Sequence, residues 1–409
     1  MLKVNKTNIF EQSLNNYFLI LFSIIPITII LGSSISLSNI LLIDISFIIL
    51  ILVKKDFLFL KSKTITYLLI LYLYLIFNSL ISLDYTSGLY RNLGFIRMII
   101  LFAAFNYFFR NQFFLKKVLT FWSAILFFIV ADIFVEFYSG KNILGYGGDQ
   151  YGQRIVSFFK DEPIVGGFVN SFYLIIFGFL FNQFKGNYKN LILIFLVICF
   201  FAIFLTGERA NSIRAFFGLF IFFFLLKENN LKKKIVYFFS ILSMVFILII
   251  NSEYLKVRYL LQIQSHFTKD QIYFKIYESG FEVFKQYKLF GVGNKNYRVE
   301  TCNQKGTEKK EKYICTTHPH QIYLEMLSEH GLLGTLLLFF IFFKLIFSKI
   351  IKVFRYDNYI EIGSLTYLIF IFLPLIPSGA FFSDHMLTVF VINLSILHSS
   401  SNKLNIFNS

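Results

Sequence analysis

The sequence predicts an all-α integral membrane protein that crosses a bilayer about twelve times. Of its 409 residues, 56% are hydrophobic and 15% are charged, and the mean hydropathy is +0.67. Soluble domains average about 45–50% apolar residues and about 25% charged residues, so much of the apolar surface here must face lipid. The apolar residues also gather in runs of roughly 20, the length of helix that crosses the hydrocarbon core.

Each apolar run is expected to form one spanning helix of a single membrane domain over residues 1–409. The first run is too long for the core of a secretory signal and lacks a small-residue cleavage site, so it is expected to be the first span. The predicted spans are residues 17–35, 37–53, 64–82, 89–109, 117–138, 163–184, 189–206, 211–226, 235–251, 321–343, 359–377 and 384–400.

The distribution of basic residues orients these spans. The net charge is +16, which in a soluble protein would point to a nucleic acid partner. Here lysines and arginines gather in alternate loops, and the short loops between them carry only Lys141, Arg154, Lys160 and Arg209. Cytoplasmic loops are the ones that are enriched in lysine and arginine. Both termini are therefore predicted to be cytoplasmic, and no nucleic acid partner is expected.

One segment, residues 252–320 between the ninth and tenth spans, is a long loop on the outer side, periplasmic if the membrane is a bacterial inner membrane. Helical apolar spacing over residues 254–287 predicts amphipathic helices on the outer leaflet. The loop holds Cys302 and Cys315. An oxidising compartment would join them in a disulfide that stabilises by about 3 kcal/mol for a loop of this size. The alternative is two free thiols.

Polar residues collect at the outer ends of the predicted spans, and a charge at membrane depth is costly enough that it tends to be functional. Arg154 precedes the sixth span by a short segment that ends in Asp161, Glu162 and Pro163. Proline and acidic residues suit the first turn of a helix. That interpretation accounts for the two acids but not for Arg154.

A tight turn between the seventh and eighth predicted spans carries Glu208 and Arg209. In one interpretation the two side chains simply pair with each other. In the other, an arginine held at the mouth of a helix bundle is a two-pronged donor to phosphate oxygens. The sequence leaves both open.

The end of the long loop carries Arg298 after a pair of glycines, and then His318 and His320 on either side of a proline. The pair Gly291 and Gly293 resembles a phosphate-binding loop but is weak evidence alone. No third ligand accompanies the histidines, so no metal is expected. A neutral imidazole that accepts a proton from a hydroxyl is favoured, and nearby arginines would keep it neutral by charge repulsion.

The order and spacing of these motifs resemble the O-antigen ligase and O-antigen polymerase family, over most of the chain from the fourth span onward. The strongest stretch is residues 290–334, with Phe-Gly-Val-Gly from 290, Asn-Tyr-Arg from 296, His-Pro-His-Gln-Ile-Tyr-Leu-Glu from 318 and Ser-Glu-His-Gly-Leu-Leu-Gly from 328. Gln321 departs mildly, since the family more usually has Asn or Ser there. The motifs do not separate ligase from polymerase.

The resemblance implies a GT-C-like glycosyltransferase of the bacterial inner membrane, which moves a glycan from undecaprenyl diphosphate to a hydroxyl without a metal or other cofactor. It implies a set of roles for residues of this chain. The expected diphosphate contacts are Arg209 and Arg298, with Arg154 as a third; the expected base is His320, with His318 as the alternative; and the expected positioning residues are Glu208, Asp161 and Glu162.

The expected partners are the lipid-linked glycan donor, an acceptor that is a glycan or lipid A core, and membrane lipids. A polysaccharide flippase or other transporter is the alternative class. Transporters often show two similar halves and polar groups at mid-membrane, whereas the polar groups of this chain gather at the outer ends of the spans.

Overall fold

The structure, a computed structural model, describes residues 2–148, 154–160, 162–186, 188–226, 231–262, 272–302, 312–356, 358–401, 403 and 405–407, with side chains from residue 11 onward. Within these ranges it is 78% helical and contains no strand. The prediction of an all-α polytopic membrane protein is confirmed, because several of these helices are long and apolar enough to cross a bilayer.

The helices follow the predicted apolar runs. The first half of the chain forms α1 (Leu2–Ser23), α2 (Ile25–Leu31), α3 (Ser33–Lys54), α4 (Lys63–Leu80), α5 (Tyr85–Leu93), α6 (Ile96–Phe109), α7 (Gln112–Ser139), α8 (Val165–Gln183) and α9 (Tyr188–Leu205). The second half forms α10 (Arg209–Leu225), α11 (Leu231–Asn251), α12 (Glu253–Lys256), α14 (Ile272–Gln286), α15 (Tyr297–Cys302), α16 (Ile322–Phe347), α17 (Ile350–Tyr356), α18 (Tyr359–Phe370) and α19 (Asp384–Ser399). Three shorter helical turns are η1 (Leu58–Lys61), η3 (Ser157–Phe159) and the π-helical η4 (Val257–Leu261).

The predicted number of twelve spans is not confirmed. In the described part of the chain, eight helices are long and apolar enough to span, or nine if α1 and α2, which meet at a bend of 43°, form one broken span. Three predicted spans correspond to shorter helices: α10 has 17 residues, α18 has 12 and α19 has 16. The eleventh predicted span is shortened because α18 ends before Pro374 and Pro377, and proline cannot continue a helix.

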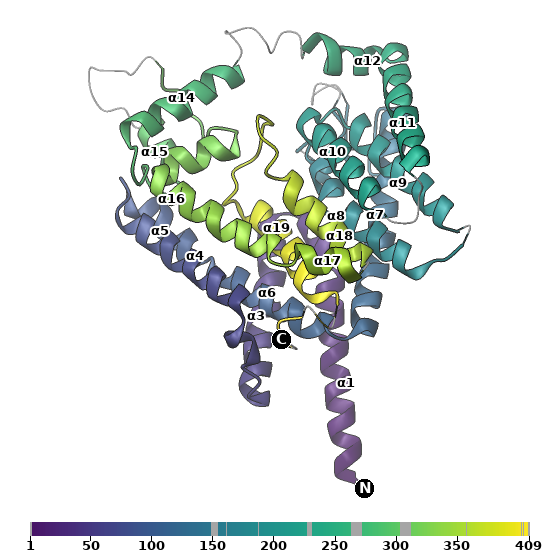
Figure 1. The fold of residues 1–409 in the computed structure, drawn as a ribbon, viewed down its shortest axis with the longest axis vertical. Helices are drawn as coiled ribbons and strands as arrows, with labels where there is room; N and C mark the ends of the chain where they lie inside the picture. The colour runs from purple at the N-terminus through teal and green to yellow at the C-terminus, as the bar shows by residue number, and fades with distance from the viewer. Residues whose placement is uncertain are drawn as a thin grey trace.

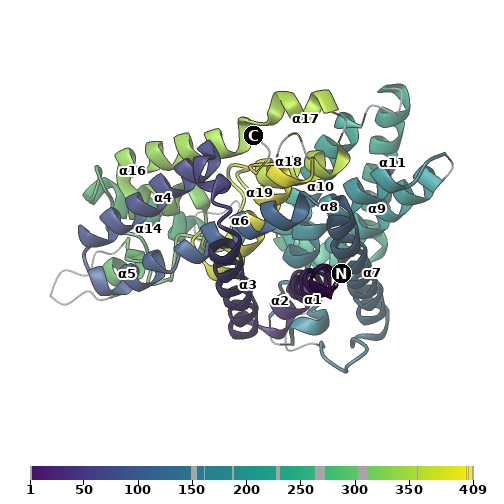
Figure 2. The same cartoon turned by 90° about the horizontal axis from the view of Figure 1, so that it is seen from below.

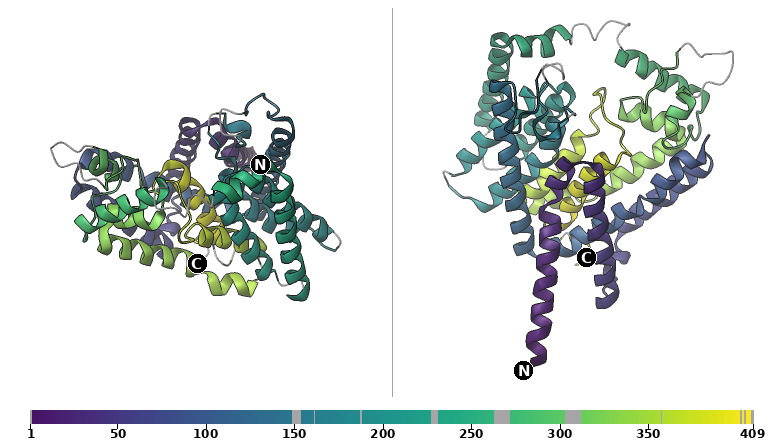
Figure 3. Two further views of the ribbon diagram at one scale, coloured as in Figure 1. Left: turned by 90° about the horizontal axis from the view of Figure 1, so that it is seen from above. Right: turned by 180° about the vertical axis from the view of Figure 1, so that it is seen from behind.

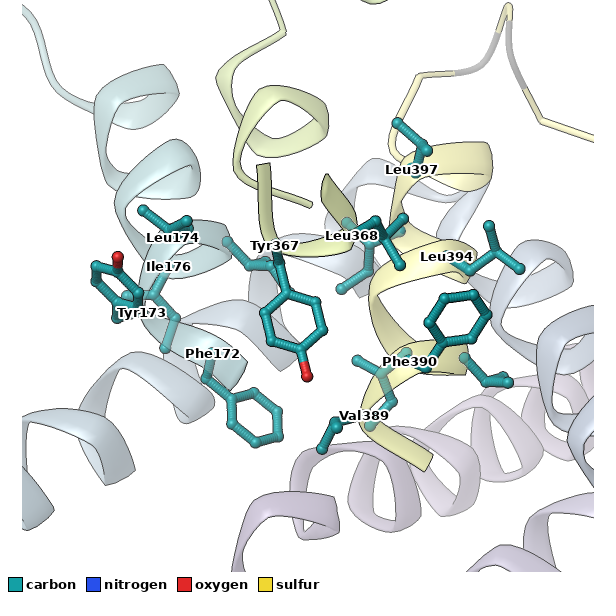
Figure 4. Packing of buried hydrophobic residues seen from close by; sticks show 14 of the residues in the cluster. Phe172, Tyr173, Leu174, Ile176, Tyr367, Leu368, Val389, Phe390, Leu394 and Leu397 are labelled. Atoms are coloured by element: carbon teal, nitrogen blue, oxygen red, sulfur yellow. The ribbon is translucent and has the colours of Figure 1, made fainter. Parts of the chain in front are cut away.

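The centre of the molecule is a three-helix packing of α8, α18 and α19, with one group of helices (α4, α5, α14 and α16) to one side and α7, α9, α10 and α11 to the other (Figure 2). Glycines allow α8 and α18 to approach closely, as small residues do between membrane helices. A Cβ atom at Gly178 would lie 2.1 Å from the Tyr359 carbonyl oxygen, and one at Gly363 would lie 2.2 Å from that of Leu174. Figure 4 shows the buried side chains that fill this centre.

The two termini lie towards one end of the molecule, whereas α12 and α14 lie at the opposite end (Figures 1 and 3). The segment 252–320 joins α11 to α16 and contains α12, η4, α14 and α15. A disulfide joins Cys302, at the end of α15, to Cys315, with their Cα atoms 4.6 Å apart. The third cysteine, Cys199, is buried in α9. The periplasmic location of this loop stays a prediction.

The glycine-containing motifs of the long loop lock it onto α16. We call this the motif interlock: residues 288–293 and residues 328–333. The Val292 and Gly293 N–H groups donate to the carbonyls of Ser328 and Glu329, at 3.0 and 2.9 Å. In return, Leu332 and Leu333 donate to the carbonyls of residues 288 and 289, at 2.8 and 3.1 Å.

Two glycines make this interlock possible. Gly331 has φ 63°, which breaks the regular helix of α16 and exposes backbone groups for pairing. A Cβ at Gly331 would lie 2.3 Å from the Leu289 carbonyl carbon, and one at Gly291 would lie 2.3 Å from that of Glu329. The glycine pair that resembles a phosphate loop is therefore occupied by protein backbone.

Candidate functional site

A pocket of about 590 Å³ lies where α10, η4, α14 and the loops before α8, α16 and α19 meet. We call it the arginine pocket. It brings together Arg154, Arg209, Glu208 and His320, four residues that the sequence singles out. The remaining lining residues are Pro163, Ile164, Ala210, Asn211, Ile213, Arg214, Arg258, Tyr273, Phe274, Tyr277, Leu375, Pro377, Ser378 and Gly379.

Glu208 connects two of these segments. Its carboxylate accepts hydrogen bonds from the N–H groups of Gly166 and Gly167, at 2.5 and 3.2 Å, and from the side-chain amide of Asn211, at 2.6 Å. Gly166 and Gly167 stand in the first turn of α8, where N–H groups lack partners within the helix. Glu208 therefore caps α8 rather than pairing with Arg209, with which it forms no ion pair within the described ranges.

Burial raises the pKa of Glu208 to about 7, and the three donors and Arg154 oppose the rise. Because the carboxylate is held by two helix N-terminal N–H groups and Asn211, it fixes the turn that carries Arg209. Glu208 thus affects the pocket by holding Arg209 in position.

Arg209, Arg214 and Arg258 each present a buried nitrogen with no hydrogen-bond partner among the described residues: Nη1 of Arg209 and Nε of the other two. Arg214 is 8% exposed, and its Nη2 donates a hydrogen bond to the carbonyl of Pro377 at 2.8 Å. A buried donor without a partner costs about 1–3 kcal/mol. Three such donors around one pocket therefore favour an anionic ligand that accepts from all of them.

Arg258 reaches the pocket because η4 is docked on the turn before α10. The Tyr259 ring stacks on Phe204 at 4.3 Å, and the Tyr259 hydroxyl donates to the Phe204 carbonyl at 2.8 Å. Arg258 in turn donates from Nη2 to the carbonyl of Gly207 at 2.7 Å. Gly207 adopts φ 73°, the left-handed conformation that glycine tolerates.

Two carboxylates of α7 hold the segment that carries Arg154. The oxygens of Glu136 accept from the N–H groups of Val156 and Ser157, at 3.0 and 2.6 Å. The Ser157 hydroxyl donates to Asp132. These contacts fix Ser157 at φ 48°, an uncommon value for a residue other than glycine. The segment is thus anchored by buried carboxyl groups near the end of α7, and Arg154 lines the arginine pocket.

The two histidines occupy different environments. His320 lines the arginine pocket and packs edge-on against the ring of Tyr273, with the ring centroids 6.0 Å apart. Its φ is 53°, and its carbonyl accepts from the N–H of Ser378 at 2.9 Å. His318 is buried, and both of its ring nitrogens are engaged: Nδ1 lies 2.9 Å from the Thr317 hydroxyl and Nε2 lies 3.2 Å from the Ser378 carbonyl.

Both imidazoles are held neutral, and burial is the main cause. Burial lowers the pKa of His318 to about 4, assisted by repulsion from His320. Burial also lowers the pKa of His320, and a hydrogen bond to the Ser378 backbone opposes that change. The expectation that arginine charges keep His320 neutral thus names the wrong cause. With both nitrogens occupied, His318 supports the loop, whereas His320 faces the pocket.

Two other predicted site residues do not line the arginine pocket. Arg298 is exposed on α15 and is absent from the pocket lining. Glu162 lines a different cavity, together with Arg97 and Asp384. Asp161 lies outside the described residues.

Sequence reasoning missed two arginines of the pocket. Arg214 stands inside a predicted span, and a charge in a membrane helix is itself a signal of function. Arg258 offers no such signal, because its position depends on the docking of Tyr259. The part of the chain that the structure describes contains no group of three or more His, Cys, Asp or Glu side chains able to hold a metal ion.

The fold is that of a polytopic membrane protein, and its arginine pocket has a lining that favours an anionic ligand. Residues 194–339 match the family model described as O-antigen ligase, which confirms the predicted resemblance to the O-antigen ligase and polymerase family. The match includes Arg209, Arg214, Arg258 and His320 but ends before the loop at 375–379. No curated protein matches the chain.

The family match assigns a coarse role. It indicates an O-antigen ligase or polymerase of surface-polysaccharide biosynthesis, which is an enzyme of glycosyltransferase type. Its partners are in general a lipid-linked glycan and an acceptor. Together with the apolar helices, the match indicates a protein of the bacterial inner membrane.

Proposed function

We propose that the chain transfers a glycan from undecaprenyl diphosphate to a hydroxyl acceptor, with the donor diphosphate in the arginine pocket. The observation that carries this proposal is the set of unpartnered nitrogens on Arg209, Arg214 and Arg258 around the pocket that also contains His320. Arginine suits a diphosphate because its planar fork donates two parallel hydrogen bonds to phosphate oxygens. Arg154 adds a fourth positive charge to the lining.

In the proposed reaction, the acceptor hydroxyl gives its proton to a ring nitrogen of His320. The acceptor oxygen forms a bond to the anomeric carbon of the donor sugar. The bond from that carbon to the diphosphate oxygen breaks, and its electron pair stays on the lipid diphosphate. The arginines stabilise the charge that grows on this leaving group, so the proposed chemistry has no step that requires a metal. The proton on His320 then passes to solvent.

A transfer assay tests the proposal. Purified protein in proteoliposomes receives native lipid-linked glycan, with and without a chelator, and the products are separated by size and by lipid anchor. Transfer that survives the chelator supports the proposed chemistry, and complete loss with rescue by a divalent cation contradicts it. A longer lipid-linked glycan identifies a polymerase, and glycan on lipid A core identifies a ligase.

The proposal also places the pocket on the periplasmic side, with both termini cytoplasmic. Single cysteines at Lys233, at the start of α11, and at Lys288, in the long loop, test this orientation, since both side chains are exposed. In intact spheroplasts, an impermeant thiol reagent should label the Lys288→Cys variant and spare the Lys233→Cys variant. The opposite labelling would place the pocket in the cytoplasm and contradict the proposal.

One observation favours a transporter as the second candidate. Asp44 lies midway along α3, is 2% exposed, and has both carboxylate oxygens without a partner among the described residues. Intramembrane carboxyl groups mark ion pathways in many transporters. If Asp44→Asn abolishes movement of lipid-linked glycan across proteoliposomes while glycan transfer is undetectable in the wild type, the transporter is the correct class.

A further inference from the structure

A second cavity, of about 410 Å³, lies beside the arginine pocket. It forms between the α2–α3 corner, α6, the segment 158–164 and the start of α19. We call it the neutral pocket, because its charged lining residues cancel: Arg97 and Lys160 against Glu162 and Asp384. The arginine pocket, in contrast, sets four arginines against Glu208.

The polar groups of the neutral pocket combine donors and acceptors. Arg97 donates from Nη2 to Asp384 across the pocket wall, and its Nε is buried with no partner in the described ranges. Asp384 remains 44% exposed at its side chain. His385, which also lines the cavity, is able to donate or accept. This mixture suits the hydroxyl groups of an uncharged ligand, each of which donates one hydrogen bond and accepts others.

The two pockets adjoin each other. Ile164 lines both, while Glu162 lines the neutral pocket and Pro163 lines the arginine pocket. The segment 162–164 is therefore the partition between them. A ligand in the neutral pocket would reach the arginine pocket past the side chain of Ile164.

We propose that the neutral pocket binds the uncharged sugar residues of the acceptor and presents their hydroxyl past Ile164 to the donor in the arginine pocket. This inference rests on the proposed function, because it assumes a carbohydrate acceptor. It assigns Arg97, Asp384 and Glu162 to acceptor recognition. Glu162 was expected to position the donor but does not line the arginine pocket, and the inference gives it a role in binding the acceptor instead.

A binding experiment tests this inference without turnover. The probe is the oligosaccharide repeat unit, released from native lipid-linked donor by mild acid and treated with phosphatase. Its binding to the full-length protein in detergent is measured by titration calorimetry without donor. Loss of a hydrogen bond to a charged group weakens binding by roughly 10- to 100-fold, so Asp384→Asn and Glu162→Gln should each weaken probe binding by about tenfold or more.

Two controls and a second variant make the outcomes decisive. Asp84→Asn removes a carboxylate that caps α5 and lines neither pocket, and it should bind the probe like the wild type. Lipid-linked donor should bind Asp384→Asn and Glu162→Gln normally. If Asp384→Asn fails to fold, Glu162→Gln decides, because Glu162 is exposed.

Wild-type probe binding in Glu162→Gln and in folded Asp384→Asn would overturn the inference, and so would equal losses of probe and donor binding. Failure of the proposed function has a different result. In that case the wild-type protein catalyses no transfer. The effect of Asp384→Asn and Glu162→Gln on probe binding is still measured, because the binding experiment needs no turnover.

Discussion

The arginine pocket and the motif interlock both contain motifs that the sequence singles out, yet their hydrogen-bond donors differ in one respect. In the interlock, the N–H groups of Val292, Gly293, Leu332 and Leu333 all have carbonyl partners. In the pocket, three arginines hold buried nitrogens that have no partner in the part of the chain that the structure describes. The interlock uses its backbone groups to hold the long loop on α16. Glu329 Oε2 and His330 Nε2 within it also lack a partner in the described ranges, but the three arginines, unlike these two atoms, line the arginine pocket.

Asn78 on α4 shows how complete the interlock is. It is fully buried, donates to the Phe290 carbonyl at 3.3 Å and accepts from the N–H of Asn294 at 2.7 Å. No space for phosphate remains at these glycines. The comparison therefore predicts that pocket variants lose activity while remaining folded, whereas interlock variants lose stability first.

The largest effect on activity is expected for His320→Ala. A general base contributes roughly 10²–10⁴-fold, so transfer should fall by about that factor. Binding of lipid-linked donor should change little, because the base acts in the transition state. His318→Ala is the matched control and should reduce transfer less, since both of its ring nitrogens are already engaged. The reverse order would make His318 the base.

The pH dependence of transfer tests the same role of His320. Because burial lowers the pKa of His320 below the usual value near 6.5, the ring is neutral at pH 7, and this histidine causes no loss of transfer above that pH. Transfer should decline as the pH falls through the lowered pKa. Burial of the neutral His320 ring also contributes to the stability of the fold. This contribution is fully present above pH 6.5 and is lost as the pH falls towards the lowered pKa of His320. A profile that declines above pH 7 would contradict the proposed base.

The largest effect on stability is expected for Gly331→Ala. Gly331 has φ 63° and ψ −170°, a conformation essentially restricted to glycine that costs another residue about 1–3 kcal/mol, and overpacking against the Leu289 backbone adds about 1–3 kcal/mol. The thermal unfolding temperature in detergent should fall sharply. Gly379→Ala is the control, because a Cβ there meets nothing within 4 Å. Equal unfolding temperatures for the two variants would remove the interlock from the account of folding.

Features that depend on one local stretch of sequence could be predicted, whereas features that depend on contacts between distant segments could not. Apolar runs predicted where helices form, because burial and lipid exposure act on each run locally. The predicted eleventh span was too long, because α18 ends before two prolines that lie inside the apolar run. The loop that follows α18 contributes Leu375, Pro377 and Ser378 to the lining of the arginine pocket. Arg258 could not be placed from sequence, since the docking of Tyr259 on Phe204 is a contact between distant segments.

A smaller loss is expected for Arg209→Lys. The charge is kept, but lysine is a point donor and cannot form two parallel bonds to phosphate. Loss of one hydrogen bond to a charged group corresponds to roughly 10- to 100-fold, so donor binding should weaken by about that factor with an unchanged unfolding temperature. Arg91→Lys, on the exposed face of α5, is the control. Unchanged donor binding would remove Arg209 from the site.

The smallest effect is expected for Arg298→Ala, which tests whether sequence order or pocket geometry identifies the donor site. The motif resemblance assigns Arg298 to the diphosphate, but the side chain is exposed on α15 and does not line the pocket. Exposed substitutions usually change stability by less than about 0.5 kcal/mol, so transfer and unfolding temperature should stay close to the wild type. Arg258→Ala is the paired variant and should lose donor binding, because it removes a partly buried guanidinium whose Nε lacks a partner among the described residues. If Arg298→Ala is instead the more damaging of the two, then α15 must move to the donor during the reaction. In that case the arginine pocket is only part of the diphosphate site.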